Sequence, residues 1–404
     1  MKGLQINSFF SVGGPPRIMN GIYDTLKENG HECKIAAARE KILYPKDSIQ
    51  IGTNRGVYLN ALESRILDND GFAAKRATKE LVRKIEEYNP DVIQLHNLHG
   101  YYINVEILFE YLKRSGKPVV WTMHDCWPAT GHCPHFTTAK CERYKEGCFQ
   151  CPLKKGYPSS YVLDQSKKNW ERKKAAFCGL DNLVIITPSR WLAGIINQSY
   201  LNNNQIKVIH NGIDLKKFFP RFSKLTERYG IQGKKIVLGV AQNWAEHKGF
   251  EDFIKLSELL DGKYQVVMIG LTDEQLKIIP PKIIGLKRTN SIEELAEWYS
   301  EALVFVNLTY QDNFPTVNIE ALSCGTPVIT YKTGGSPEAV DGKCGWVIEP
   351  GNIDQVVSIL NKLDDKGNYH DAAIKQSQLF DRKKKYQEYM DVYKTLIIEA
   401  KKNR

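Results

Sequence analysis

Short apolar runs alternate with longer amphipathic segments along this chain. Uninterrupted runs of Val, Ile and Leu are typical of strands buried on both faces of a parallel sheet, with helices covering those faces. Segments with an apolar residue every three or four positions, several ending at Gly, predict the helices. The pattern predicts strands at 3–9, 33–38, 91–97, 118–125 and 182–189, then at 235–242, 264–270, 282–289, 303–309 and 326–333, and helices that include 17–30, 103–116, 250–260, 291–302 and 316–325.

Two such series in 404 residues predict an α/β protein with two Rossmann-like doubly wound domains in tandem. The turn signal Asn211-Gly212 places the join within 206–220. Near the C-terminus, apolar residues at helical spacing predict one amphipathic helix. We therefore expect an N-terminal domain at 1–205 with a Cys-rich insert at 126–151, a C-terminal domain at 206–380, and a terminal helix at 381–404.

Composition and charge narrow the class of protein. The hydrophobic fraction is 42%, and no apolar run approaches the roughly 18 residues that a membrane span needs. The N-terminus lacks the apolar core of a secretory signal, so we expect a cytoplasmic protein. The net charge is +10, and residues 1–190 hold 28 Lys and Arg against 20 Asp and Glu. This excess fits either contact with an anionic surface or an ordinary solvated face. No Arg-rich arm or aromatic RNA-binding pattern is present, so no nucleic-acid partner is expected.

Two strand ends carry features suited to binding phosphate. Gly13 and Gly14 follow the first strand and open a helix, where bare backbone can approach an anion. Lys248, directly before Gly249, stands at the matching place in the second series and can place an ammonium on a phosphate oxygen. A plain turn and an exposed lysine are the alternatives. The chain has neither a GxGxxG dinucleotide motif nor a Walker A motif at these positions.

The stretch QDNFPTVNIEALSCGTPVIT places Asp312 and Glu320 around a predicted helix start. The first amides of that helix, at Thr316 and Val317, are suited to a phosphate. A carboxylate one turn later can accept hydrogen bonds from two sugar hydroxyls. These features together predict a nucleotide-sugar site. In the alternative interpretation, Asp312 caps the helix and Glu320 lies on the surface.

This stretch resembles the C-terminal signature of retaining glycosyltransferases of family four. The similar residues are Asp312-Asn-Phe-Pro, Glu320-Ala-Leu and the following Cys-Gly-Thr-Pro-Val. Further similar positions cover nearly the whole chain: Gly13-Gly14, His124-Asp125, TPSRWL at 187–192, HNGID at 210–214 and Lys248-Gly249. The stretch HDCWPATGHCPHF is similar to members that assemble bacterial polysaccharides.

The resemblance implies a GT-B fold, with two domains facing a cleft and the terminal helix crossing back to the N-terminal domain. It also implies a UDP- or GDP-sugar donor, transfer with retained anomeric configuration, and no catalytic metal. The implied acceptor is a glycan or lipid-linked oligosaccharide in capsule, exopolysaccharide or O-antigen synthesis. Enzymes with a lipid-linked acceptor would work at the inner face of the cytoplasmic membrane. Basic residues suited to such peripheral contact are Lys167, Lys168, Arg172, Lys173 and Lys174.

Carried over by motif, the catalytic positions are His124, Lys248, Asp312 and Glu320. Glu320 would hold the ribose, Lys248 the diphosphate and Asp312 the donor sugar, with His124 beside the reacting sugar. Asp312 replaces the family's usual Glu, and Asn243 stands where a basic residue is usual, so Arg190 or Arg288 would supplement Lys248. The donor-binding positions are Gly13, Gly14, Asn243, Arg288, Asn313, Phe314, Pro315, Thr316, Val317 and Glu320.

The insert concentrates cysteine. Cys148 and Cys151 have the spacing of a metal knuckle, but no second pair matches it. Disulfides are disfavoured in a reducing cytoplasm. The sequence leaves two possibilities, which are free thiols or a structural zinc on Cys133, Cys141, Cys148 and Cys151.

Two other functions remain open from the sequence. One is a sugar-nucleotide epimerase of the same fold, which would turn over a sugar nucleotide without any acceptor. The other is a non-enzymatic, zinc-stabilised protein that binds glycan or nucleic acid. Such a protein would keep its activity when Glu320 is replaced by Gln.

Overall fold

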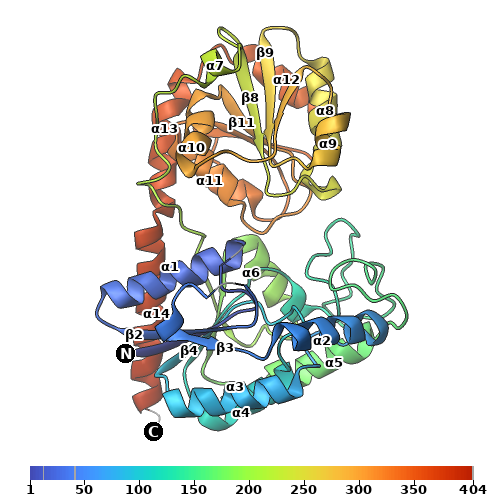
Figure 1. The fold of residues 1–404 in the computed structure, drawn as a ribbon, viewed down its shortest axis with the longest axis vertical. Coiled ribbons are helices and arrows are strands. Elements are labelled where there is room, and N and C mark those ends of the chain that lie inside the picture. The colour runs from blue at the N-terminus through green and yellow to red at the C-terminus, as the bar shows by residue number, and fades with distance from the viewer. Residues whose placement is uncertain (12, 41, 403–404) are drawn as a thin grey trace. The chain divides into compact units, whose positions relative to one another are not determined.

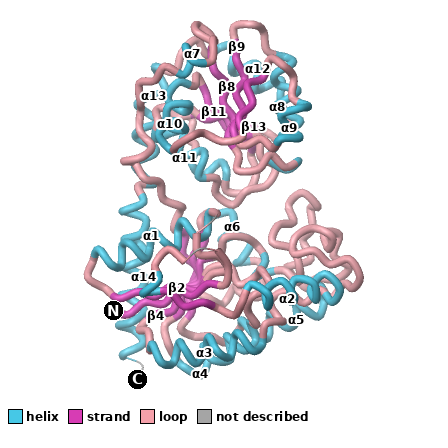
Figure 2. The backbone as a smooth tube through the Cα atoms, in the orientation of Figure 1, coloured by secondary structure: helices cyan, strands magenta, loops and turns pink. Residues whose placement is uncertain are grey.

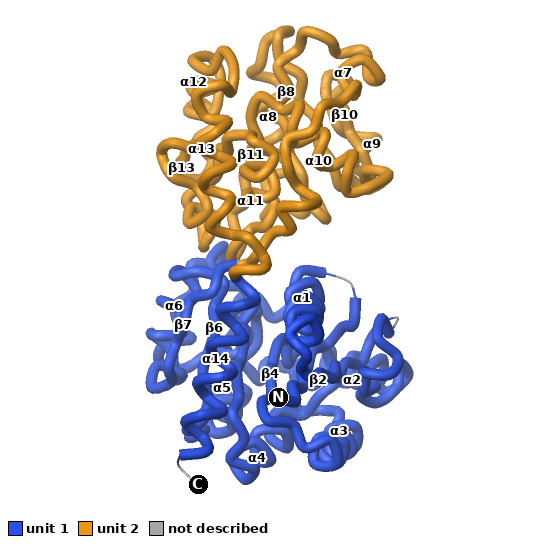
Figure 3. The backbone as a smooth tube through the Cα atoms, turned by 90° about the vertical axis from the view of Figure 1, so that its left-hand side faces the viewer, with its two compact units in different colours: residues 1–210, 385–404 blue, residues 211–384 orange. Residues whose placement is uncertain are grey.

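A computed structural model describes residues 1–11, 13–40 and 42–402 of the chain. The chain forms two compact units, one made of residues 1–210 and 385–404 and the other of residues 211–384 (Figures 1 and 3). The last helix of the chain thus belongs mainly to the same unit as the N-terminus.

The first unit is built on a seven-stranded parallel sheet in the order β3-β2-β1-β4-β5-β6-β7. Figure 2 shows the strands of this unit in magenta among helices in cyan. Because neighbouring strands are parallel, their carboxyl ends lie along one edge of the sheet. The strands are β1 (Lys2–Ile6), β2 (Glu32–Ala37), β3 (Ser48–Gln50), β4 (Val92–Leu95), β5 (Val119–Thr122), β6 (Leu183–Thr187) and β7 (Gln205–Val208).

Helices cover both faces of this sheet. One core contains apolar residues of α2 to α6, and the other contains residues of α1 and α14 packed on the opposite face. In the second core, Tyr393 of α14 donates a hydrogen bond to Gln94 Oε1 of β4 at 2.8 Å. The helices are α1 (Gly14–Glu28), α2 (Asn54–Leu67), α3 (Lys75–Tyr88), α4 (Val105–Ser115), α5 (Ser166–Phe177), α6 (Arg190–Asn197) and α14 (Arg382–Lys402), with short 3-10 helices η1 (Pro45–Asp47) and η2 (Trp127–Ala129).

The second unit holds a six-stranded parallel sheet in the order β10-β9-β8-β11-β12-β13. Alternate residues of its strands enter two cores, with α10, α11 and α13 on one face and α8 and α12 on the other. Its elements are β8 (Lys235–Val240), β9 (Tyr264–Ile269), β10 (Ile283–Leu286), β11 (Val304–Asn307), β12 (Val328–Tyr331), β13 (Gly345–Ile348), α7 (Leu225–Arg228), α8 (Phe250–Leu259), α9 (Asp273–Ile278), α10 (Ile292–Glu301), α11 (Thr316–Ser323), α12 (Ile353–Lys362), α13 (Gly367–Ser377), η3 (Glu246–Lys248), η4 (Ser336–Ala339) and η5 (Gln378–Phe380).

The predicted fold class, two parallel α/β sheets followed by a terminal helix, is confirmed. The strands that the hydrophobic pattern did not predict are β3, β7 and β13, and all three lie at sheet edges. An edge strand has one neighbour and is partly open to solvent, so it does not need a continuous apolar run. The predicted terminal helix at 381–404 is observed over Arg382–Lys402, and residues 403–404 lie outside the described part. Among the described residues, no helix combines the length and apolarity needed to cross a bilayer.

Candidate functional site

The start of α11 is a backbone site with no side-chain cap. Pro315 occupies the N-cap position, and within the described residues it supplies no side-chain cap to the first turn. Thr316 and Val317 are half-exposed there, while Asn313 and Phe314 are buried. The alternative in which Asp312 caps this helix is therefore wrong. Uncapped amides and the helix dipole make this turn suited to an anion.

Lys248 and Asp312 are brought together beside this helix start. Lys248 Nζ lies 2.6 Å from Asp312 Oδ2, and each side chain is about a quarter exposed, at 26% and 24%. Lys248 Nζ also approaches the carbonyl oxygen of Gln311 at 3.4 Å. The pair is thus shielded enough to be ordered and open enough for a ligand to compete for the ammonium.

Backbone contacts hold Lys248 in this place. The η3 turn that carries it docks on the loop after β11, where the N–H of Tyr310 donates to the carbonyl of His247 at 2.8 Å. Gly249 then adopts a φ of +75°, and a Cβ there would collide with the carbonyl oxygen of Leu308. Only glycine fits such a close approach in the left-handed region without strain. This explains the Lys-Gly pair in the sequence.

Glu320 is buried under the helix start, not on the surface. It is 4% exposed, and Tyr299 Oη donates to its Oε2 at 3.1 Å. The alternative that made Glu320 a surface residue is therefore wrong. A carboxylate that is buried needs hydrogen-bond donors, and ligand hydroxyls can complete that set.

A third loop, after β12, completes the site, and the sequence analysis missed it. Thr333 Oγ1 donates to the carbonyl of Thr309 at 2.6 Å, and the N–H of Gly335 donates to the carbonyl of Asp312 at 3.2 Å. Gly334 has a φ of +53°, and a Cβ there would collide with that same Asp312 carbonyl. The signal was present: Gly334-Gly335 follows a strand, as Gly13-Gly14 does.

Two residues predicted to bind the sugar-nucleotide donor have no side-chain contact with the Lys248–Asp312 pair in the described structure. Asn243 and Arg288 are both exposed, in the loops after β8 and β10. Within the described residues, neither side chain is held by a hydrogen bond or an ion pair, and neither contacts the Lys248–Asp312 pair in this way. Their assignment to the donor stays a prediction.

In the first unit, Gly13 and Gly14 open α1 as predicted from the sequence. Gly13 is the N-cap with a φ of 104°, and in the part of the chain that the structure describes it gives the helix no side-chain cap. A Cβ on Gly14 would meet nothing within 4 Å. The backbone here is accessible, as an anion-binding turn requires.

His124 lies at the carboxyl end of β5 next to His96, which follows the neighbouring strand β4. Their Nε2 and Nδ1 atoms are 3.0 Å apart, and His96 Nε2 is 3.1 Å from Gln5 Oε1. The amide oxygen accepts from His96 Nε2–H, which leaves His96 Nδ1 to accept from His124 Nε2–H. Burial lowers the pKa of His124 to about 4 and that of His96 well below its usual value. Both rings are therefore neutral near pH 7.

A second polar network, around Asp125, was not predicted. Asp125 accepts from His99 Nε2 at 2.7 Å and from the N–H of Trp127 at 2.9 Å, and His99 Nδ1 lies 2.9 Å from Tyr157 Oη. Burial alone would raise the pKa of Asp125, but His99 outweighs it and holds the pKa at about 2. This carboxylate orders the loop that follows His124.

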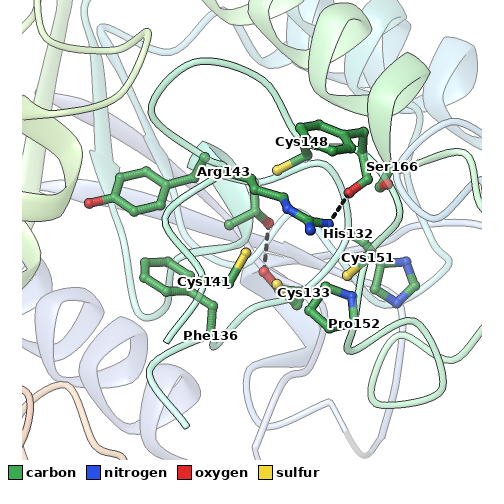
Figure 4. A pocket seen from close by; sticks show the side chains of 12 residues that line it. His132, Cys133, Phe136, Cys141, Arg143, Cys148, Cys151, Pro152 and Ser166 are labelled. Atoms are coloured by element: carbon green, nitrogen blue, oxygen red, sulfur yellow. Dashed lines mark hydrogen bonds between the residues drawn. The ribbon is translucent and has the colours of Figure 1, made fainter. Parts of the chain in front are cut away.

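The four cysteines predicted as zinc ligands line a common cavity (Figure 4). In the part of the chain that the structure describes, no three His, Cys, Asp or Glu side chains already stand close enough together to hold a metal ion. The described cysteines are all free thiols. The arrangement therefore gathers the donors without setting them in coordination geometry.

The fold and the sites at its strand ends define a two-unit α/β enzyme of the GT-B type. Two family models match the chain, Glycosyltransferase Family 4 over residues 12–217 and Glycosyl transferases group 1 over residues 222–380. The first alone covers more than half of the chain, so the chain belongs to the family-four glycosyltransferases. The resemblance seen in the sequence is confirmed, and the protein is a glycosyltransferase.

Relatives of this chain include named glycosyltransferases, one of colanic acid biosynthesis and one with an undecaprenol-linked acceptor. The chain is 26% identical over 292 residues to the putative colanic acid biosynthesis glycosyl transferase WcaC of Escherichia coli, covering 69% of each chain. It is 27% identical over 278 residues to the N,N'-diacetylbacillosaminyl-diphospho-undecaprenol alpha-1,3-N-acetylgalactosaminyltransferase of Campylobacter jejuni, covering 62% of this chain and 71% of the relative.

Solved structures share the fold at lower identity. Sucrose-phosphate synthase from Thermosynechococcus elongatus superposes with a TM-score of 0.72 at 16% identity, covering 98% of this chain and 99% of that one. HepE of Anabaena, solved with UDP-glucose, superposes with a TM-score of 0.69 at 15% identity, covering 98% and 100%. At such identities these likenesses establish the fold alone.

Proposed function

We propose that this protein moves a sugar from a UDP- or GDP-sugar, with retained anomeric configuration, onto a lipid-linked glycan acceptor. The product would be a bacterial capsule, exopolysaccharide or O-antigen. The observation that carries the proposal is the Lys248–Asp312 pair at 2.6 Å beside the uncapped start of α11. One cation, one carboxylate and a set of backbone donors gathered in this way support the binding of a sugar diphosphate.

In the proposed complex, Lys248 exchanges its carboxylate partner for the donor diphosphate. The backbone N–H groups of Phe314, Thr316 and Val317 bind phosphate oxygens, while Pro315 has no N–H to donate. Asp312, once released, binds the donor sugar. The buried carboxylate of Glu320 binds the ribose hydroxyls. The single site thus contacts each part of the donor with a group of matching chemistry.

The same groups would stabilise the transition state. The bond from the anomeric carbon to the diphosphate oxygen breaks, and the electron pair leaves with the diphosphate. The acceptor hydroxyl oxygen bonds to the same face of the sugar, and its proton passes to the departing phosphate. Amides and an ammonium already aimed at the diphosphate stabilise the charge that develops there. His124, neutral near pH 7, would serve as a hydrogen-bond partner of the sugar rather than as a cation.

The acceptor class is supported by the relatives' names, which include colanic acid and capsular polysaccharide biosynthesis and an undecaprenol-linked acceptor. HepE, solved with UDP and with UDP-glucose, makes UDP-sugars the first donors to test.

Contact with the cytoplasmic face of the membrane forms part of the proposal. Two of the five basic residues predicted for this contact are unsuited to it. Lys173 is buried at 1% exposure, and Arg172 pairs with Glu106 at 2.7 Å, so these two cannot be offered to lipid as predicted. Lys167, Lys168 and Lys174 of α5 are exposed. Reversing these three charges should weaken sedimentation with vesicles that contain anionic lipid. Binding that ignores the anionic lipid content would contradict membrane contact.

Ligand-induced stabilisation tests the donor site directly. UDP- and GDP-sugars should raise the melting temperature of the full-length protein, because a ligand of the folded state stabilises it by mass action. Glu320→Gln should reduce that shift and the transfer rate, whereas the matched exposed change Glu258→Gln on α8 should leave both unchanged. An NMR spectrum of the product should show the donor's anomeric configuration. An inverted product, or no stabilisation by any sugar nucleotide, would overturn the proposal.

A further inference from the structure

The segment between β5 and α5 directs sulfur and imidazole donors at one small cavity. Its lining includes Cys133, Cys141, Cys148, Cys151 and His132, and its volume is about 20 Å³ (Figure 4). A volume of this size holds about one water molecule or one ion. Thiolate sulfur and imidazole nitrogen are the donors that zinc prefers in proteins.

A carboxylate orients His132 in the way that is usual for a metal-binding histidine. Its Nδ1 lies 2.5 Å from Asp68 Oδ1, and the side chain is 1% exposed. The carboxylate fixes the proton on Nδ1 and leaves the lone pair on Nε2. That Nε2 is buried without a hydrogen-bond partner. A carboxylate behind the imidazole is the usual support of a histidine ligand, and a buried nitrogen without a partner is costly unless something binds it.

Three of the thiols are already linked to this environment. Cys133 and Cys151 share a side-chain hydrogen bond, and Cys148 Sγ accepts from the N–H of Gly131 at 3.2 Å. Two residues separate Cys148 from Cys151, as in metal knuckles. Cys141 lines the same cavity and, like Cys148 and Cys151, is half-buried.

A buried lysine provides compensating charge beside the thiols. Lys173 is 1% exposed, and its Nζ donates to the carbonyls of Trp127 at 2.9 Å and Thr130 at 3.0 Å. Both partners are backbone carbonyls, and among the described residues no carboxylate pairs with this ammonium. A zinc ion with three thiolates and one neutral imidazole carries a single negative charge. A nearby buried ammonium balances that charge.

We propose that Cys133, Cys148, Cys151 and His132 bind one structural zinc ion, with Asp68 supporting the histidine. This set differs from the four cysteines expected from the sequence, because His132 has the buried lone pair and because Cys133, Cys148 and Cys151 are the thiols with hydrogen bonds in this part of the described structure. In the structure the four donors line the cavity without standing close enough to share a metal ion, so the proposal requires their side chains to turn toward it. The zinc site is independent of the proposed sugar transfer.

Such a site fastens the Cys-rich segment to two helices. Asp68 caps the end of α2, and its Oδ2 accepts from the N–H of Gln165, just before α5, at 2.8 Å. The carbonyl of Asp68 also accepts from Asn169 Nδ2 of α5 at 2.5 Å. A metal on His132 therefore joins the long segment to the ends of both helices.

The zinc content of the full-length protein tests the proposal. Protein purified without chelator should contain one equivalent of zinc by mass spectrometry of its metals. Exchange for cobalt should give the absorption of a tetrahedral site, and the intensity of the sulfur-to-cobalt band reports the number of thiolates. Three thiolates support the proposed set, whereas four would return Cys141 to the site and overturn the role of His132.

Variants separate the ligands from ordinary cysteines. His132→Ala and Cys151→Ser should each lower the zinc retained at least tenfold after dialysis. Cys178→Ser is the matched control, because this half-buried thiol lies outside the cavity and contacts the carbonyl of Tyr200 at 3.2 Å, a contact that serine preserves. The control should retain its zinc. Should the ligand variants fail to fold, the zinc content and cobalt spectrum of the wild-type protein still decide the question.

Two results overturn the proposal. One is wild-type protein without zinc whose thiols at all four positions react freely with a thiol reagent. The other is a disulfide between Cys133 and Cys151 in protein purified without reductant, detected as a loss of two hydrogens in the intact mass. Because neither measurement involves a sugar nucleotide, failure here leaves the proposed transfer untouched, and failure of the transfer leaves the zinc site untouched.

Discussion

The site at the start of α11 and the polar clusters around the Cys-rich segment are built in different ways. At α11, each part stands directly after a strand, and short loops from β8, β11 and β12 meet through backbone hydrogen bonds. Around the cysteines, the chain runs from β5 to α5 with one short 3-10 helix between them. Long irregular segments of this kind are uncommon in compact domains and are usually functional. This one depends on buried polar contacts to distant residues such as Asp68 and His99.

Strand ends therefore position a site through the backbone, whereas a long insert needs side chains to order it. Replacing one functional side chain at α11 should therefore reduce activity without unfolding the unit. Replacing a buried polar side chain of the insert should mainly reduce stability.

The largest expected effect is on Lys248. Lys248→Ala should lower kcat/KM by about 10²- to 10³-fold, because it removes a preorganised charge aimed at the leaving diphosphate. Lys255→Ala, at an exposed position on α8, serves as the control and should keep full activity. Steady-state kinetics with the identified donor measure both, and the melting temperature should hardly change. Wild-type kinetics in the Lys248 variant would exclude its proposed role.

A backbone change at the same site comes next. Gly334→Ala should cost about 1–3 kcal/mol of stability, because the residue has a φ of +53° and its Cβ would press on the carbonyl of Asp312. Donor affinity should fall as well, since that carbonyl belongs to the site. Gly342→Ala is the control, because a Cβ there meets nothing within 4 Å. Denaturant unfolding and nucleotide-induced shifts measure the two effects. Equal behaviour of the two variants would show that the loop after β12 does not support the site.

In the insert, replacing Lys173 should change stability, whereas replacing Lys248 should change activity. Lys173→Met should destabilise the protein by about 1–3 kcal/mol, because two buried carbonyls lose their donor. Lys174→Met, one position along α5 and exposed, should change stability by less than about 0.5 kcal/mol. Chemical denaturation of both variants checks this. A stability loss in the exposed variant alone would reverse our view of which lysine orders the segment.

The smallest expected effect concerns pH. The folded-state pKa of His124 is about 4, below its usual value near 6.5, so folding favours the neutral ring. The resulting stability is present above pH ~6.5 and is lost as the pH falls toward 4. His124→Gln should therefore reduce the loss of stability between pH 7 and pH 5 by about 1 kcal/mol. The difference between variant and wild type separates the neighbouring rings His124 and His96 from His99 and His132, whose pKa values are raised. A protonated His124 at pH 6 in an NMR titration would contradict the expectation.

Much of the fold was readable from the sequence, because buried parallel strands need apolar residues on both faces. The strands missed were the edges β3, β7 and β13, which escape that requirement. At the start of α11, Lys248 and Asp312 were predicted from their places after strands and Glu320 from its place one turn into the helix. The structure pairs Lys248 with Asp312 and buries Glu320, but the loop at Gly334 was not predicted. Long-range polar partners such as His99 and Asp68 could not be found, because they lie far from Asp125 and His132 in the chain and carry no local signal.

The order of apolar strands, the glycines at strand ends and the acid-to-strand block were sufficient by themselves to establish two α/β sheets and a family of enzymes. Only the folded structure shows which charges pair, which lysine of α5 is buried, and which histidine lines the same cavity as the cysteines. The physical reason is the sequence distance over which each effect acts. Periodicity and turn chemistry act over a few residues, whereas the burial of a charge or an imidazole is set by neighbours from distant segments.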